Sequence, residues 1–174
     1  MMKNRLLAQL PKHKTCICSI RNPHLYIADW KNYNEGGVEI SGTQSDVINA
    51  VHLLNSNNIE VVFDGFPENA LPISKKKRSR QCECVVFPLN CNQEEWVLFI
   101  ETKYANNIRA AQNPDSEYPY CMVQQIKDTV TYFRTKGIIS NDKVVHAIIA
   151  FPNLWQDLIH GYSLLSIMAW KNLF

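Results

Sequence analysis

The chain has 174 residues, 46% of them hydrophobic and 20% charged, with a formal net charge of +2. This size and composition are typical of one globular domain with a hydrophobic core. They exclude a membrane-spanning protein, because no segment approaches the roughly 18 uninterrupted apolar residues that cross a bilayer. The N-terminal stretch also lacks the long apolar region of a signal peptide, so we expect a cytoplasmic protein.

The first predicted elements precede residue 60. Residues 1–40 contain two candidate short strands, TCICSI and HLYIADW, and we expect this segment to cap the main domain. Residues 41–58 predict a helix, because apolar side chains recur at helical spacing. Thr43, Ser45 or Asp46 can cap its start. Its apolar face consists of Val47, Ile48, Val51 and Leu54.

Three strands are predicted next. Residues 59–64 (IEVVFD) form a short apolar run, and a long loop with glycine and proline follows. Residues 82–88 (CECVVFP) and 94–103 (EEWVLFIETK) then form a hairpin around a polar turn. Both arms are apolar on both faces, which is typical of central strands with cover above and below.

A helix and a strand complete the predicted core. Residues 121–137 predict a helix that ends at Gly137. Its apolar stripe consists of Val123, Ile126, Val130 and Phe133. Residues 143–151 (KVVHAIIAF) form a buried strand, and reaching it through a helix makes it parallel to the strand at 94–103. The segment 153–174 is expected to be helical and, because it is rich in large apolar residues, to pack on this domain, on a second copy in a homodimer or on a partner subunit.

These elements predict an α/β fold in which helices flank a mixed central β-sheet. We expect a single domain over 1–174, with a cap at 1–40, a core at 41–152 and a C-terminal segment at 153–174. Six cysteines are expected as free thiols, and burial explains the two pairs of the form CxC, which share a strand face and lack the usual zinc-ligand spacing. They are Cys16, Cys18, Cys82, Cys84, Cys91 and Cys121.

The positive charge is concentrated in one run, KKKRSR at residues 75–80. Without its five basic residues, 13 basic side chains face 16 acidic ones, a net charge of −3. Such a run can be a solvated loop or a nuclear import signal, or it can bind phosphate groups without reading sequence. The candidate nucleic-acid contacts are Lys75, Lys76, Lys77, Arg78 and Arg80.

Ionisable residues occur in the hairpin where burial should be deepest. Paired residues of an antiparallel hairpin have a constant index sum, here about 184, so Glu83 is expected opposite Glu101, with Lys103 on the same face. An ion pair explains the lysine and one glutamate, but two facing carboxylates repel each other unless a divalent cation joins them. Two carboxylates suit Mg2+ or Mn2+, and a nearby lysine can help activate a water molecule for attack on phosphorus.

This pattern, Glu83 followed by the hairpin turn and then by the IETK motif, resembles the signature of the PD-(D/E)XK nuclease superfamily. The resemblance covers residues 41–152 and implies a restriction endonuclease-like αβββαβ core. It implies that Glu83 and Glu101 bind the metal ion. It also implies that the main-chain carbonyl of Thr102 completes the metal shell and that Lys103 is the catalytic lysine.

Two further residues are implied by the resemblance. Many members add a glutamine from the following helix, for which we prefer Gln125, on the flank of the apolar stripe, to Gln124, which points away. Some members add an acid from the first helix, and Asp46 is the nearest match, with Glu39 just before it.

The first metal ligand has a rival. Cys82-Glu83 replaces the Pro-Asp of the motif. The extra methylene of glutamate moves the carboxylate by about 1.5 Å, a shift that affects the coordination geometry of a metal ion. Asp64 ends the preceding predicted strand and is the other candidate, although the hairpin register favours Glu83.

The sequence therefore predicts a Mg2+- or Mn2+-dependent nuclease that acts on DNA in preference to RNA, with the basic run as a contact to phosphates. A catalytically inactive nuclease-like module that binds nucleic acid or assists assembly is the alternative. A third hypothesis is a protein-interaction domain in which the basic run is only a solvated loop.

Overall fold

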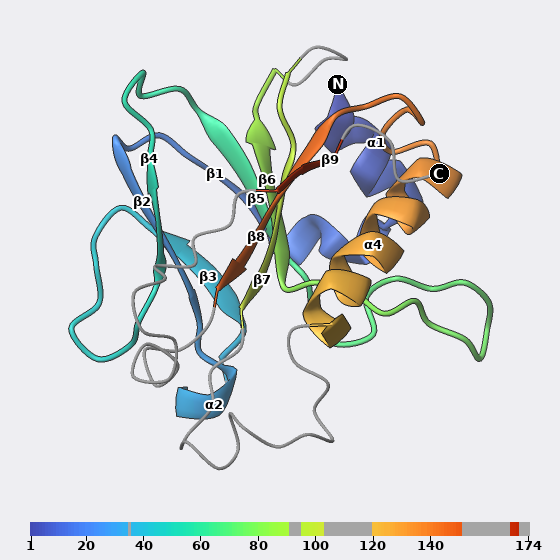
Figure 1. The fold of residues 1–174 in the computed structure, drawn as a ribbon, viewed down its shortest axis with the longest axis horizontal. Coiled ribbons are helices and arrows are strands. Elements are labelled where there is room, and N and C mark those ends of the chain that lie inside the picture. Colours follow the sequence, from blue (N-terminus) through green and yellow to red (C-terminus); the bar gives the residue numbers. More distant parts are fainter. Residues whose placement is uncertain (35, 91–94, 103–119, 151–167, 171–174) are drawn as a thin grey trace.

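The computed structural model describes residues 1–34, 36–90, 95–102, 120–150 and 168–170. These residues form three layers, which are a layer of helices, a mixed sheet in the middle and a small antiparallel sheet (Figure 1). We call the two sheets the central sheet and the small sheet. No helix of the described residues is long and apolar enough to cross a membrane.

In the described part of the chain, the central sheet has six strands in the order β1-β5-β6-β7-β8-β9. Neighbours are antiparallel except β7 and β8, which are parallel. Strands β5, β6 and β7 are buried at every position, as their continuous apolar runs predict. The bounds are β1 Ile17–Ile20, β5 Val61–Gly65, β6 Cys84–Pro88, β7 Leu98–Thr102, β8 Val145–Ala150 and β9 Met168–Trp170.

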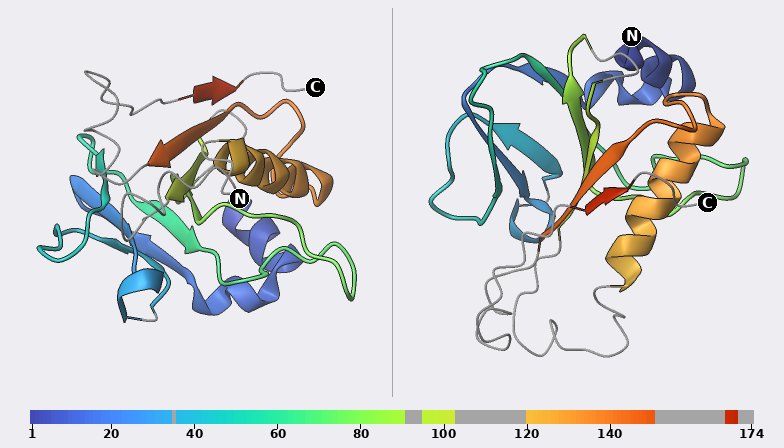
Figure 2. Two further views of the ribbon diagram at one scale, coloured as in Figure 1. Left: turned by 60° about the horizontal axis from the view of Figure 1, so that its bottom comes forward. Right: turned by 45° about the horizontal axis from the view of Figure 1, so that its top comes forward.

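Helices cover one face of the central sheet, as Figures 1 and 2 show. Apolar residues of α1 (Met2–Gln9) and α4 (Tyr120–Thr135), such as Leu6 and Phe133, join one core cluster with the strand residues that point to this face. The 3-10 helix η1 (Pro11–Thr15) connects α1 to β1. The helical layer therefore combines a helix from the N-terminus of the chain with the helix that connects β7 to β8.

The small sheet covers the opposite face (Figure 1). Its strands are antiparallel in the order β3-β2-β4, and Leu25 and Val51 from its inner face pack against strands of the central sheet. A short helix, α2, follows β2. The bounds are β2 His24–Asp29, α2 Lys31–Asn34, β3 Val38–Ser41 and β4 Val51–Leu54.

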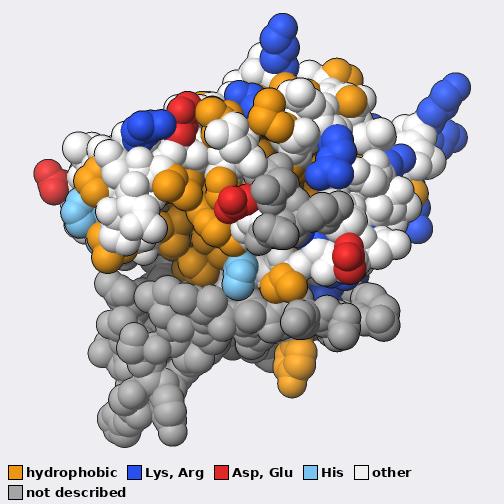
Figure 3. Space-filling view, turned by 90° about the horizontal axis from the view of Figure 1, so that it is seen from above, with side chains coloured by type: hydrophobic (Ala, Val, Ile, Leu, Met, Phe, Trp, Pro, Cys, Tyr) orange, Lys and Arg blue, Asp and Glu red, His pale blue; other side chains and the backbone are white. Residues whose placement is uncertain are grey.

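An apolar cavity opens between the two sheets. Its volume is about 500 Å³, and Leu25, Leu53, Trp96 and Leu98 are among the side chains that line it. Figure 3 shows apolar side chains gathered in a hollow on this face of the molecule. The described residues that line this cavity include no carboxylate, which separates it from the carboxylates of the hairpin.

Most of the predicted core is confirmed. The strand predicted at 59–64 is β5, the hairpin arms are β6 and β7, and the crossover through α4 makes β8 parallel to β7. The predicted helix ends as expected, because Gly137 has a φ of +65°, a conformation that favours glycine after the last helical turn. The protein is therefore an α/β protein with a mixed sheet covered on both faces.

The helix predicted over 41–58 is wrong. The structure has an irregular loop at 42–50, followed by strand β4. Val47 is 58% exposed, so the supposed apolar face is not buried as a unit. Pairing with β2 makes residues 51–54 a strand instead of a helix. It buries Val51 and partly buries Leu53 against the central sheet, while Leu54 points outward.

Two other expectations also change. Helices do not flank both faces of the central sheet, since the small sheet covers one of them. The segment 153–174 is not helical throughout, because Met168–Trp170 forms β9 and pairs with β8, which satisfies main-chain groups at the edge of that strand. The other residues of this segment lie outside the described ones. Residues 1–40, expected as a cap, supply α1 to the core and β1 to the central sheet.

Candidate active site

The two predicted carboxylates lie at one end of the β6–β7 hairpin, with Glu83 just before β6 and Glu101 in β7. Cys84 pairs with Ile100, which confirms the expected index sum of 184. The main-chain N–H of Glu83 donates to the carbonyl of Ile100 at 3.1 Å. Glu83 and Cys84 thus both lie next to Ile100, and the regular ladder ends at the bend of Glu83, so it does not pair Glu83 with Glu101. Both acids lie at the end of the hairpin away from its turn, and the charges of both raise the pKa of Cys82.

Glu101 is a fully buried carboxylate, with an exposed fraction of 0%. It pairs with Ile149 of β8, whose side chain belongs to the core cluster on the helix-covered face. Burying a carboxylate in such a core is costly. The position of Glu101 is therefore the strongest single sign of a function at this end of the hairpin.

The two cysteines beside these acids stay protonated. Burial raises the pKa of Cys82, and the charges of Glu101 and Glu83 raise it further. Burial also raises the pKa of Cys84. The prediction that both thiols share a strand face is wrong, since they lie in different core clusters on either side of a bend at Glu83. Protonated thiols are poor metal ligands, so a metal ion at this site would need the carboxylates as donors.

Glu83 lines a cavity of about 380 Å³ at the end of its strand, together with Asp29, Lys31, Phe66 and Glu68. The ammonium of Lys31 forms an ion pair with Glu68 at 2.9 Å, and its main-chain N–H donates to Asp29 at 3.0 Å. The hydrogen bond with Glu68 raises the pKa of Lys31, and the nearby Glu83 and Asp29 raise it further. Lys31 thus remains a cation beside the first predicted metal ligand.

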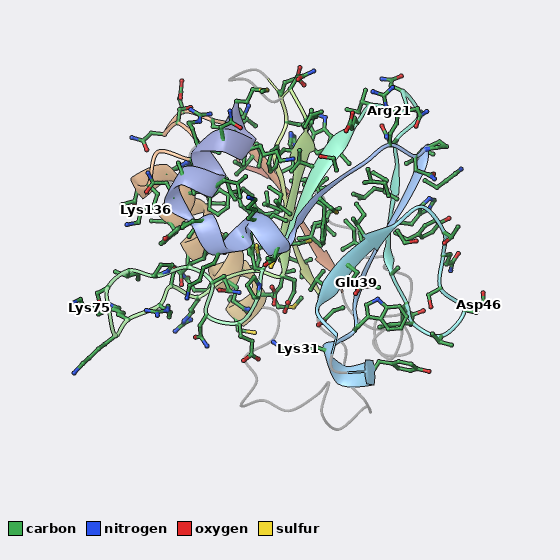
Figure 4. The ribbon with its side chains drawn as sticks, turned by 180° about the vertical axis from the view of Figure 1, so that it is seen from behind. Arg21, Lys31, Glu39, Asp46, Lys75 and Lys136 are labelled. Atoms are coloured by element: carbon green, nitrogen blue, oxygen red, sulfur yellow. The ribbon has the colours of Figure 1, made fainter. Side chains whose placement is uncertain are left out.

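The sequence analysis did not find Lys31. It lies in α2, far from Glu83 in sequence, and a single lysine before a turn has no motif around it. Figure 4 shows Lys31 beside α2 at the foot of the central sheet. Its charge offsets part of the repulsion among the acids of the cavity.

Asp64, the other candidate for the first metal ligand, forms a hydrogen bond with a histidine. It is 0% exposed, and its Oδ2 lies 2.7 Å from Nδ1 of His13, which is itself only 1% exposed. Burial raises the pKa of Asp64, while the hydrogen bond and charge of His13 lower it in part. Asp64 is therefore part of a buried pair, whereas Glu83 faces an open cavity. No sequence signal joins His13 to Asp64, because they come from η1 and β5.

The remaining motif residues are placed differently. Thr102 is the last residue of β7 and its side chain is buried. Lys103 lies outside the described residues. Asp46 is exposed in the loop that replaces the predicted helix, at the edge of the molecule in Figure 4, and Glu39 is exposed on β3. Neither acid is among the described residues that line the Glu83 cavity.

Gln125 is turned toward the chain that enters β6. Its side-chain amide donates to the carbonyl of Gln81 at 2.8 Å. Gln124 is exposed and donates to Asp128 instead. Gln125 and Arg80 also line a second cavity of about 380 Å³, so the preferred glutamine lies between the basic run and the strand of Glu83.

The basic run forms the tip of a projecting loop, residues 67–81, which we call the basic finger. Its two sides are joined by a hydrogen bond from the Ile73 N–H to the Lys77 carbonyl at 3.0 Å. The side chain of Gln81 accepts from the Ala70 N–H at 2.7 Å and so fixes the base. Figure 4 shows Lys75 at the outer end. The exposed basic residues are Lys75, Lys76, Lys77, Arg78 and Arg80.

The described residues contain no group of three or more histidine, cysteine, aspartate or glutamate side chains placed to hold a metal ion. Two carboxylates are nevertheless a sufficient protein donor set for Mg2+, which keeps several of its water ligands. Glu83 and Glu101 thus fit this ion by the chemistry of their oxygen donors.

Comparison of the chain with protein-family models, curated proteins and solved structures finds no match. Function must therefore be inferred from the side chains of the site, since an α/β fold is compatible with many activities.

Proposed function

We propose that the protein is a metal-dependent nuclease that hydrolyses phosphodiester bonds in DNA. The observation that carries the proposal is the buried carboxylate of Glu101 in β7, with Glu83 at the same end of the hairpin and the charges of both acids acting on Cys82. The order β5, β6, β7, α4 and β8, with β8 parallel to β7, supports the restriction endonuclease-like core implied by the resemblance to the PD-(D/E)XK superfamily.

Each residue has a role that follows from its chemistry. Glu83 and Glu101 would hold Mg2+ or Mn2+, with the main-chain carbonyl of Thr102. When bound, the ion supplies positive charge next to the phosphate and lowers the pKa of a water molecule. Lys103 orients the attacking water and neutralises charge that develops on the phosphate. Gln125 assists from the first turns of α4.

The basic finger provides the contact to DNA in this proposal. Its exposed lysines and arginines attract phosphate groups of any sequence. The finger enters β6 directly, and its base is fixed by the side chain of Gln81. A strand held by the finger would therefore lie close to Glu83.

A nuclease-like module that binds nucleic acid without cutting it is the second candidate. The complete burial of Glu101 favours it, because a catalytic carboxylate must reach a metal ion. The two candidates differ in metal-dependent cleavage, and they share DNA binding by the basic finger.

Cleavage of supercoiled plasmid and of linear single- and double-stranded DNA tests the proposal. We expect nicking or degradation with Mg2+ or Mn2+ and none with EDTA, because the site needs a divalent cation. DNA binding without cleavage under any metal would favour the non-cutting module. Absence of both binding and cleavage would contradict both candidates and leave a protein-interaction domain.

Removal of the finger charges is expected to weaken DNA binding. Each lysine that contacts a phosphate releases a counterion from the DNA. Replacing one such lysine therefore makes the negative slope of log K against log salt concentration less steep by about 0.9. We expect this change for Lys75→Ala and a larger one for the triple variant at Lys75, Lys76 and Lys77. Fluorescence anisotropy of labelled DNA at several salt concentrations measures both.

The comparison variants are Lys136→Ala and Arg21→Ala. Lys136 lies over the Tyr132 ring, which is also within reach of the charge of Arg78 in the finger, so this variant tests a cation beside the finger. Arg21→Ala is the control away from the finger, because Figure 4 shows Arg21 on the other side of the molecule from Lys75. Equal weakening by Lys75→Ala and Arg21→Ala would mean that net charge, and not the finger, governs binding.

A further inference from the structure

Two histidines face each other on the small sheet, outside the candidate active site. His24 begins β2 and His52 lies in β4. Nδ1 of His24 is 3.0 Å from Nε2 of His52, and both residues are exposed. They belong to the outer face of the sheet, because their strand neighbours Leu25 and Val51 are buried toward the central sheet.

The two rings are held in place by their surroundings. Strand pairing sets His52 opposite Tyr26 and His24 opposite Leu54, so the histidines are diagonal neighbours. The Tyr26 ring stacks on His52 with centroids 4.6 Å apart and planes inclined by 8°. The main-chain N–H of His24 donates to the Asn22 side chain at 2.9 Å. The His24 ring stacks on the His52 ring with centroids 5.3 Å apart and planes inclined by 25°, so the two rings are already in contact.

The separation of the two nitrogens suits cis coordination of one metal ion. Imidazole nitrogens lie about 2.0–2.1 Å from a bound transition metal, so a 3.0 Å separation corresponds to an angle of roughly 91–97° at the ion. This is the angle between neighbouring ligands in tetragonal sites of Cu2+ and Ni2+, and it is smaller than the tetrahedral angle of Zn2+ sites.

We propose that His24 and His52 form a surface site for a divalent transition-metal ion of the Cu2+ or Ni2+ type. The His24 ring, which stacks on His52 in the metal-free protein, turns about its Cβ–Cγ bond so that the lone pairs of both nitrogens point at the ion. The ion takes the place of the hydrogen bond between the rings, and the donor ring carries its proton on its other nitrogen, which leaves both imidazoles neutral. Since no third histidine, cysteine or acid of the described residues completes the group, water or an external ligand fills the other positions. Mg2+ prefers oxygen ligands, so this site is independent of the proposed active site.

Binding of Ni2+ to the metal-free protein tests the proposal by isothermal titration calorimetry. Ni2+ is the probe because it doesn't oxidise thiols, and a Cys16→Ser/Cys18→Ser background removes the thiols on and beside β1. We expect one Ni2+ per chain, weaker Zn2+ and no Mg2+ at this site. His24→Gln or His52→Gln should each lower Ni2+ affinity by at least about tenfold, the lower limit for losing even an outer-shell partner.

His146→Gln is the matched control, because His146 lies on β8 and lines the cavity between the sheets. It should bind Ni2+ as the background protein does. Paramagnetic broadening of the His24 and His52 ring signals by Ni2+ gives a readout that needs no substitution at the site. Unchanged Ni2+ affinity in His24→Gln/His52→Gln, or broadening confined to other residues, would overturn the proposal.

Discussion

Replacing His13 by alanine is expected to lower the free energy of unfolding by about 1–3 kcal/mol, the cost of leaving a buried hydrogen-bonding group without its partner. His13 and Asp64 are both almost completely buried, and their 2.7 Å contact joins the N-terminal segment to β5. Among the described residues, no other hydrogen-bond partner faces Oδ1 of Asp64. The variant would therefore leave Asp64 buried with neither carboxylate oxygen satisfied.

The loss should depend on pH through Asp64. Burial raises the pKa of Asp64 in the folded protein, and the variant also loses the His13 interaction that lowers this pKa. Above the raised pKa, the folded variant carries an uncompensated buried charge. As the pH falls through that pKa, the folded state binds the proton before the unfolded state does, and the penalty is lost.

The double variant His13→Ala/Asp64→Asn isolates this effect, because it has the same shape without the titrating group. We expect it to be more stable than His13→Ala at neutral pH, and the difference to shrink as the pH is lowered toward 4. Urea denaturation followed by circular dichroism at several pH values measures both variants. A constant difference across this range would show that ionised Asp64 isn't the source of the instability, and wild-type stability of His13→Ala would contradict the role of the pair.

The elements that the sequence predicts correctly are those whose signal is local. The register of β6 and β7 follows from the position of one turn, and the parallel β8 follows from a single intervening helix. Burial of α4 follows from its own apolar stripe. The position of Glu83 and Glu101 at one end of the hairpin could be predicted for the same reason, but the bend at Glu83 that interrupts the register has no local signal.

The elements that the sequence analysis missed depend on contacts between distant segments. Val51 fits a helical stripe as well as a strand, and only pairing with β2 selects the strand. The C-terminal segment looks helical locally, whereas β9 depends on the open edge of β8. Lys31 and His13 reach the acids of the hairpin and of β5 through the tertiary fold, and no spacing in the sequence encodes either approach.

Replacing Glu101 by glutamine is expected to reduce metal-dependent DNA cleavage by about 10²- to 10⁴-fold. A bound divalent ion contributes several kcal/mol to the transition state, and each 1.36 kcal/mol corresponds to a factor of ten in rate. Glutamine keeps the shape of the buried side chain and removes only the charge that the ion requires. DNA binding should be retained, because the basic finger is unchanged. Plasmid cleavage rates and anisotropy with the same protein preparations measure the two effects separately.

Glu39→Gln is the matched control for this loss. It makes the same chemical change on the exposed face of β3 (Figure 4), and it should cleave DNA at the wild-type rate. Glu83→Gln should behave as Glu101→Gln does, because both carboxylates are needed to hold the ion. Loss of cleavage in all three variants would indicate a general effect of charge, and wild-type cleavage by Glu101→Gln would exclude the hairpin as the catalytic site. If Glu101→Gln is inactive while Glu83→Gln retains full activity, another acid supplies the first ligand, and the carboxylates that line the Glu83 cavity, Asp29 and Glu68, become the next to be tested.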